Sequence, residues 1–105
     1  MGEKTYLRRL GADNRMRVRF TTEKGNVTHF VVQYETLIEN KWVAITRYDT
    51  AHGFAHQDTM HPDGSHDKKR LPFLSNRQAL TAAISDIALH WATYRERYQK
   101  EVNML

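Results

Sequence analysis

Apolar and charged residues alternate strictly along residues 15–21 of the chain. One side of this segment carries three apolar residues and the other three arginines: Met16, Val18 and Phe20 against Arg15, Arg17 and Arg19. A period of two is typical of a β-strand that buries one face and exposes the other. We therefore expect a half-buried strand here, with an arginine stripe on its exposed side.

Similar patterns predict further strands on either side of this one. Residues 27–38 and 42–48 are rich in aromatic and β-branched residues, and residues 5–10 add another candidate strand. Short polar turns separate these segments, so we expect an antiparallel meander. Two shorter strands, at 54–60 and 66–71, are expected to form a hairpin around Pro62-Asp63-Gly64. The pattern leaves open whether this hairpin pairs with the meander.

The period changes to helical after residue 75. Apolar residues then recur at steps of three and four: Leu80, Ile84, Ile87, Trp91, Tyr94 and Tyr98. Ser75 followed by Gln78 fits a capping box, which predicts where the helix begins. We expect a helix over about 76–101 that follows a sheet over about 5–71. The fold class predicted for residues 1–105 is one α+β domain, with the long amphipathic helix packed on the antiparallel sheet.

Composition removes several classes of function. The 105 residues include no cysteine, which excludes disulfides, thiolate metal sites and cysteine nucleophiles. No apolar run reaches the roughly 20 residues needed to cross a bilayer, and we expect a cytoplasmic protein that does not enter a membrane. Phosphate-binding and dinucleotide-binding glycine motifs are missing as well. We accordingly predict no cofactor.

The net charge of +4 is concentrated at one end of the sequence. Residues 1–20 carry six cations against two acids, whereas residues 21–105 carry ten of each. A local excess of positive charge is the usual mark of a polyanionic partner. Arg15, Arg17 and Arg19 are therefore our candidates for binding nucleic acid. The alternative is a solvated sheet face that happens to use arginine.

Candidate chemistry is concentrated between residues 47 and 67, where four of the six histidines lie. One interpretation is acid–base chemistry on RNA without a metal. Its candidate catalytic residues are Arg47, Tyr48, Asp49, His52 and His56. A weaker interpretation is a metal site formed by His52, His56 and Asp58. The third interpretation is structural, with Asp49 capping a turn and the histidines serving only in packing.

The run Arg47-Tyr48-Asp49-Thr50-Ala51-His52-Gly53, followed by Ala55-His56-Gln57-Asp58 and His61-Pro62-Asp63-Gly64, resembles a family of small prokaryotic proteins over roughly residues 26–100. More distantly, the arrangement of Tyr48, Asp49, His52 and His56 after a meander is similar to the TumE-like toxins of toxin–antitoxin pairs. That resemblance implies a toxin directed at RNA or translation, with a small antitoxin as its protein partner.

Three hypotheses of function follow. The first is an RNA-directed protein of toxin–antitoxin type, in which His52 and His56 transfer protons and Arg47 contacts phosphate. The second is a non-enzymatic binding or assembly module that forms a homodimer through its C-terminal helix. The third is a metal-binding protein that uses histidine and aspartate. The sequence alone does not decide between an enzyme and a binding protein.

Overall fold

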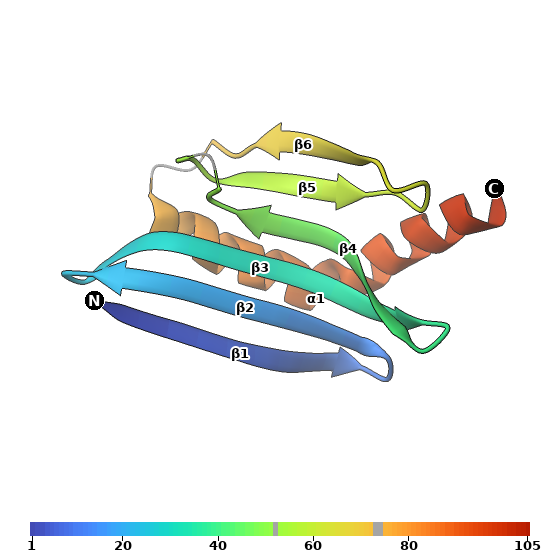
Figure 1. Cartoon of the computed structure of the whole chain (residues 1–105), viewed down its shortest axis with the longest axis horizontal. Coiled ribbons are helices and arrows are strands. Elements are labelled where there is room, and N and C mark those ends of the chain that lie inside the picture. Colours follow the sequence, from blue (N-terminus) through green and yellow to red (C-terminus); the bar gives the residue numbers. More distant parts are fainter. Residues whose placement is uncertain (52, 73–74) are drawn as a thin grey trace.

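A sheet of antiparallel strands, followed by one helix, makes up the computed structural model, which describes residues 1–51, 53–72 and 75–105 (Figure 1). The elements within those residues are β1 (Gly2–Gly11), β2 (Asn14–Glu23), β3 (Asn26–Ile38), β4 (Lys41–Asp49), β5 (His56–Met60), β6 (His66–Arg70) and α1 (Asn76–Asn103). The predicted α+β class and the order of sheet before helix are both confirmed.

The strands lie in the sheet in the same order as in the sequence, β1 to β6, and each is antiparallel to the next. The hairpin of β5 and β6 pairs with the meander through β4, which answers the question that the sequence left open. Residues 54 and 55, predicted to be part of the fifth strand, instead lie in the turn before β5. In that turn Gly53 has a φ of +81°, which a glycine adopts without steric cost.

α1 covers one face of the sheet and leaves the other uncovered by any described helix (Figure 1). It packs mainly on β3 and β4. Alternate residues of the strands point toward it and form the core, together with one side of α1; the largest fully buried side chains are Tyr34, Phe30, Met16, Ile45 and Ile87. The alternation read from residues 15–21 is confirmed, because Met16 and Val18 are both fully buried.

The helix begins where the capping residues predicted. The Ser75 side chain accepts a hydrogen bond of 3.1 Å from the backbone N–H of Gln78, which satisfies one of the unpaired donors of the first turn. Asn76 and Arg77 then donate hydrogen bonds to backbone carbonyls around the β2–β3 turn, namely those of Gly25, Val27 and Thr28. These contacts fix the start of α1 over one end of the sheet.

The apolar stripe of α1 faces the sheet of its own chain. Leu80, Ile87 and Tyr98 are buried, and Ile84, Trp91 and Tyr94 are partly buried against the same core. The side chain of Leu89, by contrast, is exposed on the helix. The stripe is thus used within the chain, and homodimerisation through α1 stays a prediction.

Candidate functional site

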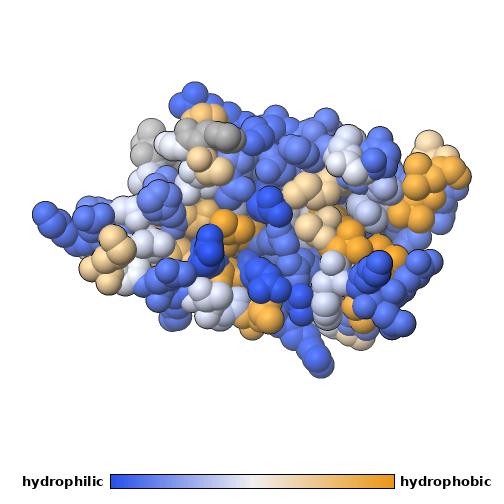
Figure 2. Space-filling view, viewed as in Figure 1, coloured by the Kyte–Doolittle hydropathy of each residue, from blue (hydrophilic) through white to orange (hydrophobic). Residues whose placement is uncertain are grey.

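The face of the sheet opposite α1, which we call the open face, is the candidate functional surface. Residues paired across an antiparallel ladder lie on the same face, so the strand register identifies its members. One row across the sheet consists of Thr5, Arg19, Val31, Asp49, His56 and Arg70, and the next consists of Leu7, Arg17, Gln33, Arg47, Asp58 and Lys68. Figure 2 shows this side of the molecule as mostly hydrophilic, with apolar side chains interspersed.

The register thus places the arginine stripe and the aspartate–histidine segment on one surface. Arg15, Arg17 and Arg19 of β2 lie on the same face as Arg47 of β4, and Arg9 of β1 pairs with Arg15. At the other edge of the sheet, Lys68 and Arg70 of β6 add positive charge to this face. Cations therefore extend over the open face from β1 to β6.

Glu35 holds two of these arginines in place. Its carboxylate is buried and accepts hydrogen bonds from Arg15 Nε at 2.6 Å, Gln33 Nε2 at 2.5 Å and Arg17 Nε at 3.3 Å. Burial by itself would raise the pKa of Glu35, but the hydrogen bonds from Arg15, Gln33 and Arg17 outweigh burial and hold that pKa below its usual value. Glu35 therefore positions the guanidinium groups as an ion.

An exposed aromatic ring lies beside these cations. Trp42 is 41% exposed and lies at the start of β4, where it pairs with Leu37 of β3 on the open face. The Arg15 guanidinium lies 3.9 Å from the centroid of the Trp42 ring. A flat aromatic surface with an adjacent cation is a common platform on which nucleic-acid bases stack.

A buried cluster of two carboxylates and one imidazole lies farther along the open face. His56 Nε2 is 2.7 Å from Asp49 Oδ1 and 3.7 Å from Asp58 Oδ2. The Asp49 carboxylate also accepts the backbone N–H of Ala51 at 3.0 Å, so the predicted turn-capping role of Asp49 is confirmed. The ring of Phe54 packs edge-on against His56, and the Arg70 guanidinium lies over Phe54. These groups help to keep His56 fully buried.

Next to this cluster is a pocket of about 390 Å³. Its wall includes Arg19, His29 and Asp49, which come from three neighbouring strands. Unlike His56, His29 is exposed. Sequence reasoning finds only a weak signal for His29, because this residue stands alone on the polar side of its strand. The register of β3 with β4 brings it to the same pocket as Asp49.

The structure separates the residues that the sequence grouped as catalytic. Arg47, Asp49 and His56 share the open face, and Arg47 donates a hydrogen bond of 2.7 Å to Gln33. Tyr48 lies on the opposite face, where its hydroxyl donates a hydrogen bond of 2.6 Å to Asp86 of α1. Burial, and next the adjacent Asp86 carboxylate, raise the pKa of Tyr48.

His52 lies outside the described residues, so its predicted roles in the catalytic set and in the metal set stay predictions. Of the weaker metal set, His56 and Asp58 do come together, with Asp49 as the third member.

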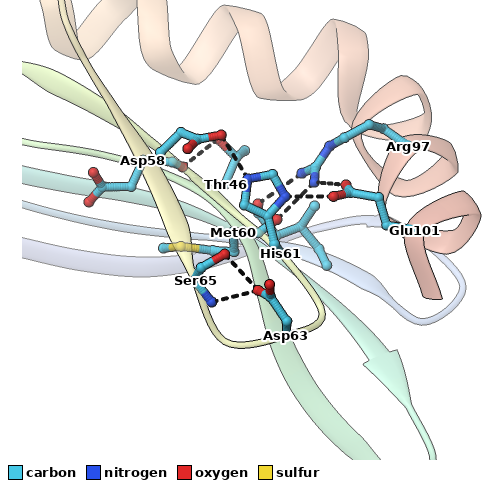
Figure 3. Close-up of polar contacts among 10 residues, drawn as sticks. Thr46, Asp58, Met60, His61, Asp63, Ser65, Arg97 and Glu101 are labelled. Atoms are coloured by element: carbon cyan, nitrogen blue, oxygen red, sulfur yellow. Dashed lines mark hydrogen bonds and ion pairs between the residues drawn. The ribbon is translucent and has the colours of Figure 1, made fainter. Parts of the chain in front are cut away.

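A separate polar cluster joins the β5–β6 turn to the end of α1 (Figure 3). His61 contacts Glu101 at 2.6 Å and Asp67 at 2.8 Å. Arg97 donates hydrogen bonds to Glu101 and to the carbonyl oxygen of Met60. Hydrogen bonds to Asp67 and Glu101 raise the pKa of His61. Through these contacts the cluster fastens the last turns of α1 to the end of β5 and the turn after it.

The chain belongs to the family of a domain of unknown function, DUF7718, whose family model matches residues 1–104. A search of curated proteins found no match to the chain, and a search of solved structures found none either. Among the described residues, no helix combines the length and the apolarity needed to cross a bilayer.

Proposed function

We propose that this protein is RNA-directed and binds single-stranded RNA across the open face of its sheet. The observation that carries the proposal is the register, which gathers arginines of four strands, an exposed tryptophan and a pocket on one surface. Cationic side chains follow the phosphates of a single strand, and aromatic rings stack on its bases. On the opposite face, α1 covers β3 and β4 and so leaves less of the sheet open to such a ligand.

The salt dependence of RNA binding tests the electrostatic part of the proposal. For single strands, the slope of log K against log salt concentration is about −0.7 for each phosphate contact. We expect a slope of roughly −2 to −4 for a short labelled RNA, which corresponds to several contacts. The variant Arg9→Gln/Arg19→Gln removes two exposed cations from the open face. It is expected to make the slope less negative by about 1.4, because two phosphate contacts are lost.

A matched control is available on the same edge strand. Lys4 and Arg8 of β1 are exposed and pair with Phe20 and Met16, so they lie on the side of the sheet that faces α1. The variant Lys4→Gln/Arg8→Gln loses the same charge as the open-face variant and is expected to keep the slope of the wild type. If both double variants reduce the slope equally, net charge rather than the open face governs binding, and the proposal is wrong.

Stacking on Trp42 is tested separately from charge. The variant Trp42→Ala is expected to weaken RNA binding by about 1–3 kcal/mol, the range measured for loss of one stacked base. It is expected to leave the slope against salt unchanged, because the variant removes no phosphate contact. A changed slope with unchanged affinity would contradict a stacking role.

The resemblance to TumE-like toxins supports a toxin role for this RNA-binding face, with an antitoxin as the protein partner. In this proposal, Arg19 and His29 act on RNA held in the pocket, the first by stabilising phosphate charge and the second by proton transfer. His56 is fully buried, which argues against direct contact with RNA.

We expect growth inhibition and RNA cleavage by the wild type, and loss of both in His29→Asn. The control is His90→Asn, which changes an exposed histidine of α1. Equal activity of the two variants would remove His29 from the mechanism.

A further inference from the structure

The Asp49–His56–Asp58 cluster differs from an ordinary surface ion pair in its burial and in its convergence. Asp49 of β4 pairs across the ladder with His56 of β5, and Asp58 follows two residues later on the same face. All three residues are buried. Each offers one oxygen or nitrogen atom that can coordinate a metal ion, and these three atoms lie within 4.8 Å of one another. Two oxygens and one nitrogen thus converge at one point between two neighbouring strands.

The orientation of His56 directs one particular nitrogen toward the carboxylates. Its Nδ1 lies 3.4 Å from the carbonyl oxygen of Phe54, an acceptor that favours a hydrogen on Nδ1. Nε2 then faces Asp49 Oδ1 at 2.7 Å and Asp58 Oδ2 at 3.7 Å. A nitrogen lone pair and carboxylate oxygens repel one another unless a hydrogen or a cation lies between them. A backbone carbonyl that orients the outer nitrogen is also the usual partner of a metal-binding histidine.

A second observation points independently to a cation site. Asp58 Oδ1 is buried and accepts no hydrogen bond from the residues that the structure describes. A buried carboxylate oxygen without a partner is costly, and such atoms are few in native proteins. The Nζ atom of Lys68 lies 3.9 Å from this oxygen, which is beyond hydrogen-bond distance, and 3.4 Å from His56 Nε2.

We propose that Asp49, His56 and Asp58 bind one divalent transition-metal ion, of the class of Zn²⁺ or Mn²⁺. Carboxylate oxygen together with imidazole nitrogen suits these ions. Their double positive charge balances the two carboxylates. The Lys68 side chain is 40% exposed, so it can leave for solvent when the metal enters. The site stands independently of RNA binding, since none of the three ligands is required for the electrostatic tests above.

The test is calorimetric titration of the full chain, purified without a polyhistidine tag and stripped with a chelator, with Zn²⁺ alone and with Mn²⁺ alone. We expect one equivalent of metal per chain. The variant Asp58→Asn is expected to weaken binding by roughly tenfold or more, because loss of a mere outer-shell partner already costs that much. The variant Lys68→Met is expected to strengthen binding by roughly tenfold, because it removes a competing charge within 4 Å of the site.

The Lys68 variant keeps the test decisive if Asp58→Asn does not fold, because Lys68 is a surface residue of the edge strand β6. The matched control is Glu101→Gln, which disrupts the other histidine–carboxylate cluster, around His61, and is expected to bind metal as the wild type does. Three results would each overturn the proposal. These are no binding at millimolar metal, loss of binding in Glu101→Gln but not in Asp58→Asn, and an unchanged affinity in Lys68→Met.

Discussion

Replacing Glu35 by Gln is expected to make the protein less stable and yet a tighter binder of RNA. Glu35 is the buried carboxylate that holds Arg15 and Arg17 on the open face. Glutamine keeps the shape of the side chain but removes its charge. The two arginines, whose side chains are 22% and 43% exposed, then become available to phosphate groups.

The cost in stability follows from the hydrogen bonds that Glu35 makes. A hydrogen bond to a charged group contributes about 1.5–3 kcal/mol, and the glutamine oxygen retains one of the three acceptor contacts. Both arginines regain water, so we expect a net loss of about 2 kcal/mol in the free energy of unfolding. By contrast, Arg15→Met leaves the buried carboxylate with weaker partners and is expected to cost more, about 3–5 kcal/mol.

The gain in RNA binding follows from the number of phosphate contacts. Release of Arg15 and Arg17 adds one or two contacts, each of which changes the slope by about −0.7. Between 50 and 200 mM salt, the loss of affinity then grows by a factor of about 2.6 to 7 relative to the wild type. Urea unfolding measures the stability, and fluorescence anisotropy of a labelled RNA at several salt concentrations measures the slope.

The control for Glu35→Gln is Glu96→Gln, which removes the same charge from the exposed side of α1. We expect this variant to keep the wild-type slope, because it lies on the other side of the sheet from the bound RNA. If Glu35→Gln weakens RNA binding along with stability, Glu35 serves to preorganise the arginines for RNA rather than to restrain them. The predicted gain in RNA affinity would then be wrong.

Three further predictions concern the scaffold. The variant Ile87→Ala removes a fully buried side chain of α1 and is expected to cost about 2–5 kcal/mol in urea unfolding, with RNA affinity unchanged in the folded protein. The variant Tyr48→Phe removes one of the hydroxyls that donate to Asp86 and is expected to cost about 1 kcal/mol without changing the slope against salt. The raised pKa of His61 means that its contribution to stability is complete below the unfolded value of 6.5 and is lost as the pH rises through the folded value. Unfolding at a series of pH values is expected to show this loss, and His61→Gln is expected to abolish it; an identical pH profile would contradict the link to Glu101.

The fold was predictable because its signals are local. Alternation at Met16 and Val18 identified a half-buried strand, and Ser75 with Gln78 marked the start of α1. Each signal depends on neighbours within a few residues, which a sequence displays directly. The pairing of β5 with β4 was not predictable, because it depends on which edge of the sheet lies nearest to β5 in the folded chain.

The candidate site was predictable only in part, because it depends on register. Asp49 and His56 are seven positions apart in the sequence, and they meet because β4 and β5 pair at these two residues. A shift of one residue in that pairing sends one of the two to the opposite face. Burial of His56 was equally hidden, because it depends on Phe54 and Arg70 as well as on the strands. The place of His29 beside Asp49 was hidden for the same reason, since residues of β1, β2, β3 and β4 line their shared pocket.

The tripeptide Arg47-Tyr48-Asp49 shows how one short motif serves both faces of a sheet. Strand alternation sends Arg47 and Asp49 to the open face and Tyr48 to α1, where Tyr48 and Tyr94 both donate to Asp86. The tyrosine thus anchors the helix to the strand that carries the two polar neighbours. A contiguous motif in a strand therefore need not be a single site, and its middle residue can be required for the fold while the flanking residues are required for function. Unfolding of Tyr48→Phe therefore tests the fold, whereas the arginine variants test the proposed RNA binding and Asp58→Asn tests the proposed metal site.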